Sequence, residues 1–169
     1  MKKEMKRNKI TALIIIVITI GFLWTSCDPA KGWENDEKRM IDDFLATRGD
    51  TVFEKKASGL YFLTLQEGTG DYADKNDTAA IRFTGYFLDY SIFDTNIGTS
   101  QPLGFIVGSG YIIKGLDEGI QYMKKGGRAR MITPSSLAYG SMGIRGIVSG
   151  YTPLVWDIQL VELKPAAKK

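Results

Sequence analysis

The sequence predicts an α+β domain built mainly from antiparallel strands. Five short stretches after residue 58 are rich in aromatic and aliphatic residues and are bounded by turn residues, as strands are. Only one segment among them, 112–123, has helical spacing, and no regular alternation of strands and helices indicates a parallel sheet. The length of 169 residues suits a single domain, without internal repeats or low-complexity segments.

An amphipathic helix over roughly 33–47 is the first element that we expect after the N-terminal region. Gly49 is a suitable residue to end it. We expect 27–32, which contains Pro and Gly, to form a tether without regular structure. The apolar side of the helix is expected to dock on the domain, with packing against a partner or across a dimer as alternatives. The residues at helical intervals are Trp33, Glu37, Met40, Ile41, Phe44 and Leu45.

Three strands are expected next along the chain. GLYFLTLQEG (59–68) alternates between apolar and polar residues, TAAIRFTGYFLD (78–89) contains Gly85, and PLGFIVG (102–108) is short and apolar. A glycine inside a strand indicates a bulge or the close approach of another segment.

One short helix and two further strands complete the expected domain. IIKGLDEGIQYM (112–123) is apolar at both ends, so we expect this helix to be buried. GGRARMITP (126–134) and TPLVWDIQLVEL (152–163) have strand character, and the second alternates apolar residues with Asp157 and Gln159.

Residues 1–26 have the composition of a secretory signal peptide. The basic start MKKEMKRNK is followed by LIIIVITIGFLW, an apolar run shorter than the roughly 20 residues that span a bilayer as a helix. This region holds five Lys or Arg and one acidic residue, whereas the remaining chain holds 17 basic and 18 acidic residues. The nearly neutral remainder argues against a nucleic-acid partner.

The residues WTSC, which end in the only cysteine, resemble a bacterial lipobox, although Trp24 stands where the pattern usually has leucine. The resemblance implies that Cys27 is lipidated and becomes the new N-terminus. Each buried CH₂ of an acyl chain contributes about 0.8 kcal/mol, so several chains would hold the protein on a membrane. We expect the outer membrane of a Gram-negative bacterium, facing the periplasm. The alternative is an ordinary signal peptide or uncleaved anchor with an incidental cysteine.

The residue types present restrict the chemistry. The sequence contains no histidine, which excludes His-based triads, Cys–His pairs and imidazole metal sites. GSGYIIKG has a GxG pattern, but neither Lys-Ser/Thr nor a strand–turn–helix context accompanies it. We therefore expect no nucleotide, no metal and no cofactor.

Six segments, in their order and spacing, resemble FKBP-type peptidyl-prolyl cis-trans isomerases: RFTGYF, IFDTN, PLGFIVGSGYIIKGLDEGI, GGRARMITPSSLAYG, GI and LVWDIQLVEL. The resemblance implies a curved antiparallel sheet of about five strands wrapped around one short helix. It extends to lipid-anchored bacterial members, which carry a helical N-terminal extension. The expected parts are a lipoprotein signal peptide (1–26), a tether (27–32), a helical extension (33–58), the isomerase domain (59–164) and a tail (165–169).

The resemblance also implies the site residues. Tyr139 of the AYG loop would donate a hydrogen bond to a substrate carbonyl, the backbone N–H of Ile113 would bind a carbonyl, and Asp94 would act electrostatically. A packing role for Tyr139 and a capping role for Asp94 are the alternatives. The apolar walls around the prolyl ring would comprise Phe83, Phe93, Leu103, Ile112, Leu116 and Trp156, and the rim would comprise Ile144, Ile147 and Val148.

Four wall positions depart from the family pattern. Phe83 lacks the hydroxyl that many members direct at the pocket aspartate, Leu116 and Leu103 replace frequent aromatic residues, and Trp156 replaces a phenylalanine. Since each change conserves apolarity, we expect the pocket to persist, with weaker turnover and reduced affinity for a macrolide.

The predicted function is therefore a membrane-tethered isomerase that assists folding of exported, proline-containing polypeptides. The alternative is a catalytically weak binding module or chaperone in a membrane-associated assembly.

Overall fold

A computed structural model of the chain describes residues 29–47 and 52–167. The chain divides into two units, Met1–Gly32 and Trp33–Lys169, and the architecture below is that of the second unit. The predicted signal peptide and Cys27 lie outside the described residues. Within the described ranges, no helix is long and apolar enough to cross a membrane.

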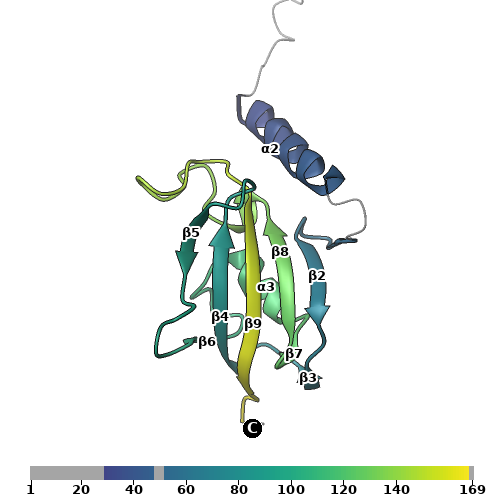
Figure 1. The fold of residues 1–169 in the computed structure, drawn as a ribbon, viewed down its shortest axis with the longest axis vertical. Coiled ribbons are helices and arrows are strands. Elements are labelled where there is room, and N and C mark those ends of the chain that lie inside the picture. The colour runs from purple at the N-terminus through teal and green to yellow at the C-terminus, as the bar shows by residue number, and fades with distance from the viewer. Residues whose placement is uncertain (1–28, 48–51, 168–169) are drawn as a thin grey trace, which may run out of the picture. The chain divides into compact units, whose positions relative to one another are not determined.

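An antiparallel sheet forms the body of the second unit. Its strand order is β1-β2-β8-β9-β4-β5, and β6 also pairs with β4, while β3 and β7 form a separate two-stranded sheet. Figure 1 shows the long strands β4 and β9 side by side. The strands are β1 (Glu54–Lys55), β2 (Tyr61–Gln66), β3 (Thr69–Tyr72), β4 (Thr78–Tyr86), β5 (Ile92–Thr95), β6 (Leu103–Ile106), β7 (Lys124–Lys125), β8 (Arg128–Thr133) and β9 (Leu154–Lys164).

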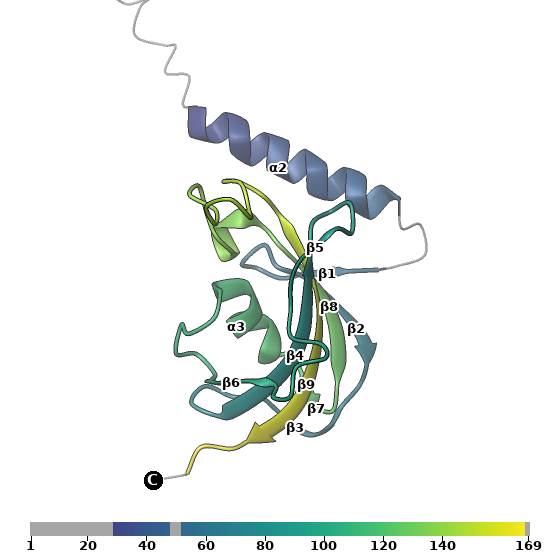
Figure 2. The same ribbon diagram turned by 60° about the vertical axis from the view of Figure 1, so that its left-hand side comes forward.

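The sheet curves around the short helix α3 (Lys114–Ile120), as Figure 2 shows, so the expected fold is confirmed. Apolar side chains alternate along the strands, so every second side chain of β9 faces the helix and forms the core with it. Gly119 allows α3 to lie close to β8, since a Cβ at this position would clash with the Met131 side chain. The core around α3 includes Leu60, Ile81, Leu116, Ile120, Met131, Leu154, Trp156, Ile158 and Leu160.

The opposite face of the same strands is covered by the part of α2 (Pro29–Ala46) that belongs to this unit, from Trp33 onward. Ile41 and Phe44 are buried against side chains that point away from α3, namely Tyr61, Ile132 and Val155. The helix therefore docks on its own domain, as expected, and the predicted apolar face is correct at its C-terminal half. Met40 is an exception, because 45% of its surface remains exposed.

The start of α2 differs from the prediction. The helix begins at Pro29, so the segment expected to be a tether without regular structure is helical from that residue onward. Proline has a fixed φ and lacks only an N–H that would be unpaired in the first turn, which makes it favourable at a helix start.

Four short strands, β1, β3, β5 and β7, were not predicted. They have two to four residues each and are mostly exposed, so they show no apolar alternation. The helix ends at Ala46, close to the expected end at 47, and because β1 pairs with β2, the last part of the region 33–58 belongs to the sheet.

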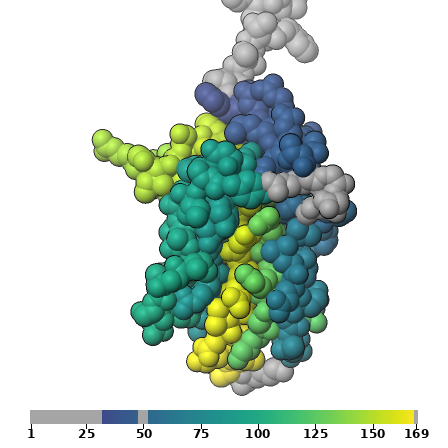
Figure 3. All heavy atoms as spheres, in the orientation of Figure 1, coloured from purple at the N-terminus to yellow at the C-terminus, as the bar shows by residue number. Residues whose placement is uncertain are grey.

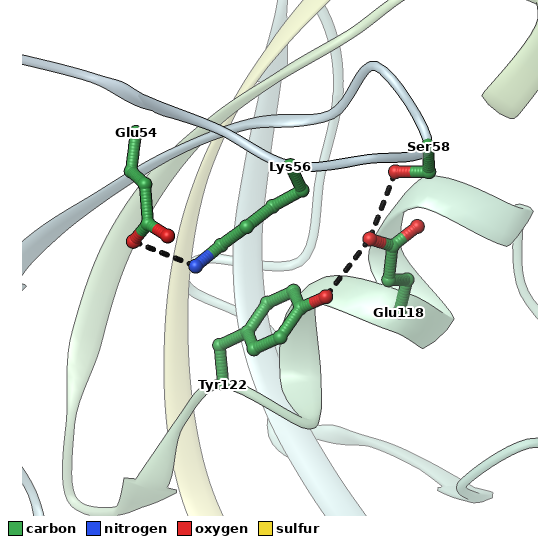
Figure 4. Close-up of polar contacts among 5 residues, drawn as sticks. All are labelled: Glu54, Lys56, Ser58, Glu118 and Tyr122. Carbon is green, nitrogen blue, oxygen red and sulfur yellow. Dashed lines mark hydrogen bonds and ion pairs between the residues drawn. The ribbon is translucent and has the colours of Figure 1, made fainter.

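The turn between β1 and β2 is joined to the C-terminal end of α3 by a polar network (Figure 4). Glu118 accepts hydrogen bonds from the Ser58 hydroxyl at 2.8 Å and the Tyr122 hydroxyl at 3.1 Å. The Lys56 ammonium pairs with Glu54 at 2.7 Å and lies 4.2 Å from the centre of the Tyr122 ring. This network holds the helix at the end remote from Ile113.

Candidate active site

Trp156 lies at the centre of the candidate site, with only 2% of its surface exposed. Its indole N–H donates a hydrogen bond of 2.9 Å to the Thr133 hydroxyl on the neighbouring strand β8. The ring centres of Phe93 and Phe83 lie 5.2 Å and 6.0 Å from that of Trp156. The buried hydrogen bond fixes the orientation of the indole, because a buried N–H without a partner is costly.

Gly85 allows these aromatic rings to meet. A Cβ at this position would lie 2.7 Å from the Phe93 ring and 2.8 Å from the Trp156 ring. The register between β4 and β5 also shifts next to Gly85. The sequence-based interpretation of this glycine, a bulge or a close approach, is therefore confirmed in both respects.

The start of α3 forms a second wall. Leu116 is buried, and Ile112 and Ile113 are half-buried against the same apolar cluster as Trp156. Ile113 precedes the helix as its N-cap, and its carbonyl accepts hydrogen bonds from the amides of Leu116 and Asp117. The N–H of an N-cap residue lies outside the helical ladder, which leaves that of Ile113 in a suitable place to bind a carbonyl.

The segment that leads into α3 is held by Asp117. This buried carboxylate accepts hydrogen bonds from the amides of Gly108 at 2.7 Å and Gly110 at 3.2 Å. The two glycines have positive φ values of 77° and 71°. Asp117 therefore fixes the path of the chain just before Ile112 and Ile113.

Tyr139 reaches the site from the long loop between β8 and β9. A short 3₁₀ helix, η1 (Ser135–Leu137), opens this loop, which projects from the body in Figure 3 as a yellow-green segment. The Tyr139 ring meets Phe93 edge to face, with 6.5 Å between ring centres and an interplanar angle of 88°. Among the described residues, no hydrogen bond involves the Tyr139 hydroxyl, so this donor is available to a ligand.

The charge of Asp94 acts on this hydroxyl. Burial raises the pKa of Tyr139, and the negative charge of Asp94 raises it further. Asp94 itself is exposed on β5, opposite Gly85 of β4. The site thus contains a phenol that burial and the charge of Asp94 both keep protonated, with Asp94 itself at the solvent edge.

The expected rim residues separate into two groups. Ile144 and Val148 form a β-bridge with hydrogen bonds of 2.8 Å and 2.9 Å, and Val148 is buried. Ile147 is 56% exposed and does not pack on the site.

Ten of the twelve residues predicted for the isomerase site belong to, or pack against, one apolar cluster. The exceptions are Asp94 and Ile147. The ten are Phe83, Phe93, Leu103, Ile112, Ile113, Leu116, Tyr139, Ile144, Val148 and Trp156.

Sequence reasoning missed two residues that position this cluster. Thr133 and Asp117 are ordinary polar residues in a strand and a helix, and only their burial shows their roles. No signal in the sequence distinguishes them, since Asp117 is followed by the acidic Glu118 and Thr133 stands at the end of its strand, before Pro134. Among the described residues, no group of three or more Cys, Asp or Glu side chains is arranged to hold a metal.

Comparison with known proteins identifies this arrangement. Residues 70–161 match the family model described as FKBP-type peptidyl-prolyl cis-trans isomerase. The chain belongs to this family, which confirms the expected fold family and class of enzyme.

Individual relatives agree with this assignment. The FK506-binding protein of Neisseria meningitidis serogroup B is 34% identical over 105 residues, which are 62% of this chain and 96% of that protein. The FKBP-type peptidyl-prolyl cis-trans isomerase FkpA of Escherichia coli K12 is 33% identical over 139 residues, which cover 82% of this chain and 47% of FkpA. The FK506-binding protein 4 of Emericella nidulans is 36% identical over 80% of this chain, which spans only 28% of that protein.

Solved structures show the same fold. The peptidyl-prolyl cis-trans isomerase of Pseudomonas syringae pv. tomato superposes with a TM-score of 0.67 at 27% identity, over 83% of this chain and 99% of its own. Escherichia coli FkpA superposes with a TM-score of 0.68 at 25% identity, over 95% of this chain and 72% of its own.

Proposed function

We propose that this chain is a lipid-anchored isomerase that accelerates prolyl rotation in exported polypeptides at a membrane surface. The observation that carries the proposal is the Tyr139 hydroxyl, half-buried beside Phe93 and without a partner among the described residues. A donor placed at the edge of an apolar cluster suits a ligand with an apolar ring and an adjacent carbonyl, which is the chemistry of a prolyl peptide.

The proposed mechanism requires no acid or base. Rotation about an X–Pro bond has a barrier near 20 kcal/mol because amide resonance is lost on twisting. The twisted amide is less charge-separated than the planar one, so an apolar site favours it over the ground state. Tyr139 and the Ile113 N–H would bind carbonyls that flank the rotating bond, while Trp156 and Leu116 hold the prolyl ring.

Membrane attachment is supported by the sequence of the first 27 residues. A basic start, a short apolar run and a single cysteine after small residues suit lipidation of Cys27. Outer-membrane location, facing the periplasm, follows if the cell is Gram-negative.

Lipidation is tested by mass spectrometry of the N-terminal peptide from membrane-extracted protein. A lipid-modified peptide beginning at Cys27 is expected, and an unmodified or uncleaved N-terminus would contradict the proposal. Cys27→Ser should release the protein from the membrane fraction.

A macrolide is the second proposed ligand, because two relatives are named FK506-binding proteins. Leu103 and Leu116 present less surface than the aromatic residues frequent at these positions, so affinity for FK506 should be reduced. Leu116→Trp should strengthen FK506 binding in a calorimetric titration, and unchanged or weaker binding would argue that position 116 does not contact this ligand.

A catalytically weak binding module is the alternative, favoured by Phe83, which has no hydroxyl with which to orient Asp94. The deciding experiment measures proline-limited refolding of a test protein in the presence of the full chain in detergent. We expect clear acceleration, reduced by Tyr139→Phe and Asp94→Ala but not by Asp71→Ala, an exposed acid on β3. If a folded sample does not accelerate refolding, the isomerase proposal is wrong and the binding module is the remaining function.

A further inference from the structure

Glu37 of α2 is a buried carboxylate, with 7% of its surface exposed. One of its oxygens accepts a hydrogen bond from the Ser135 backbone N–H, and the other accepts one from the Ser135 hydroxyl at 2.9 Å. These partners lie 98 residues further along the chain, at the start of η1. A buried carboxyl group is stable only with hydrogen-bond partners, so this contact fixes α2 against the start of the loop.

A second contact joins α2 to the other end of the same loop. The rings of Trp33 and Tyr151 are stacked, with centres 5.7 Å apart and an interplanar angle of 6°. Tyr151 has a positive φ of 57°, and its N–H donates a hydrogen bond of 2.9 Å to the Gly140 carbonyl. α2 therefore contacts the loop both before and after Tyr139, and Figure 2 shows the helix running beside this loop.

Ser135 is linked by hydrogen bonds to the backbone on both sides of Tyr139. The Ser135 carbonyl accepts hydrogen bonds from the amides of Ala138 at 2.9 Å and Gly140 at 2.8 Å, the residues on either side of Tyr139. An anchor on Ser135 thus limits the movement of the peptide units that orient the Tyr139 ring. The hydroxyl at the end of that ring makes no hydrogen bond among the described residues, so the loop backbone and the contact with Phe93 determine where it points.

We propose that Glu37 is a positioning residue of the isomerase, through which α2 holds the Tyr139 hydroxyl in place for its substrate. The inference rests on the role of Tyr139 given under Proposed function. The N-terminal helix is then part of the catalytic apparatus of this chain and more than a spacer between membrane and domain.

The test is a double-mutant cycle on kcat/KM for an X–Pro peptide, measured with the full chain in detergent. The variants are Glu37→Ala, Tyr139→Phe and the two together. We expect each single change to lower kcat/KM about tenfold, because small misplacements of a binding group have large effects on rate. The double variant should be little slower than either single one, since Glu37 acts only through Tyr139.

Two further variants separate positioning from folding. Glu37→Gln keeps the shape and one acceptor oxygen, and should retain more activity than Glu37→Ala with a nearly unchanged thermal midpoint. Asp42→Asn, which removes an exposed acid from the same helix, should leave kcat/KM unchanged. Amide exchange at residues 135–140 should quicken in Glu37→Ala while that of β4 and β9 stays slow, which shows a loosened loop in a folded domain.

The outcomes distinguish this inference from the proposed function. If Tyr139→Phe lowers kcat/KM but Glu37→Ala does not, or if the two effects multiply, the inference is overturned and the role of Tyr139 stands. If Tyr139→Phe alone has no effect, the role of Tyr139 is wrong and the inference fails with it.

Discussion

The two ends of α3 place a tyrosine in opposite situations. Past the C-terminal end, the Tyr122 hydroxyl donates to Glu118, and the Lys56 ammonium covers the ring. Towards the N-terminal end, the Tyr139 ring leans on Phe93, and its hydroxyl lacks a partner among the described residues. Burial is the first cause that raises the pKa of each tyrosine, followed by Glu118 for Tyr122 and by Asp94 for Tyr139.

The two hydroxyls therefore differ in their role: that of Tyr122 is structural, and that of Tyr139 is available to a ligand. The hydrogen bond of the Tyr122 hydroxyl is already formed, with the same Glu118 oxygen that accepts from Ser58 of the β1–β2 turn, so this hydroxyl has a structural role. A hydroxyl left without a protein partner beside an apolar cluster remains available for a ligand carbonyl. The predictions below test this contrast, beginning with the largest expected effect.

Removal of the Trp156 ring should have the largest effect, at the N-terminal end of α3 where Tyr139 lies. Trp156→Ala is expected to lower the free energy of unfolding by about 3–5 kcal/mol, because a large buried side chain leaves a cavity. It should also abolish isomerase activity, since Phe93 loses its support. Urea unfolding and an X–Pro peptide assay measure both effects. Trp156→Phe is the control, because it keeps an aromatic ring and should retain part of each.

Addition of a single methyl group should displace the same rings. Gly85→Ala is expected to lower the free energy of unfolding by about 1–3 kcal/mol, because its Cβ would overlap the rings of Phe93 and Trp156. Activity should fall with it. The matched change Gly104→Ala on β6, where a Cβ meets nothing within 4 Å, should alter neither quantity by a comparable amount. Equal effects of the two changes on stability would contradict the close approach at Gly85.

Removal of each hydroxyl should separate the two tyrosines. Tyr139→Phe should lower kcat/KM roughly tenfold with little change in stability, since one hydrogen bond to the substrate is lost. Tyr122→Phe should lower the free energy of unfolding by about 1 kcal/mol and leave kcat/KM unchanged. A loss of activity in Tyr122→Phe as large as that in Tyr139→Phe would remove the distinction between the two ends of α3.

The pH dependence of stability should show the smallest effect. A raised tyrosine pKa means that the unfolded chain releases the proton first as pH rises past the ordinary value near 10. Stability linked to Tyr122 and Tyr139 is therefore complete below about pH 10 and is lost above it. Denaturant midpoints measured from pH 8 to 11 should fall less steeply in the variant that combines Tyr122→Phe with Tyr139→Phe than in the unchanged protein. A midpoint that rises with pH over this range would contradict the direction of both shifts.

The sequence by itself determined the long elements and the apolar part of the site. β4, β8, β9 and α3 were predictable because their alternation or helical spacing records which face is buried. Phe93, Leu116 and Trp156 were predictable as neighbours only through resemblance to a family, since they belong to three separate elements. Gly85 was predictable from its place inside a strand, because a glycine weakens a strand and is favoured there chiefly where the backbone bulges or a neighbour lies close.

Tertiary structure alone decided the polar contacts that position the site. Glu37 with Ser135 and Trp156 with Thr133 are pairs separated by 98 and 23 residues, and local periodicity carries no information at such distances. The short strands β1 and β5 likewise form only because β2 and β4 offer open edges, since two to four exposed residues cannot determine a strand alone. Apolar patterning determines which face of an element is buried, whereas long-range packing determines which polar groups meet there.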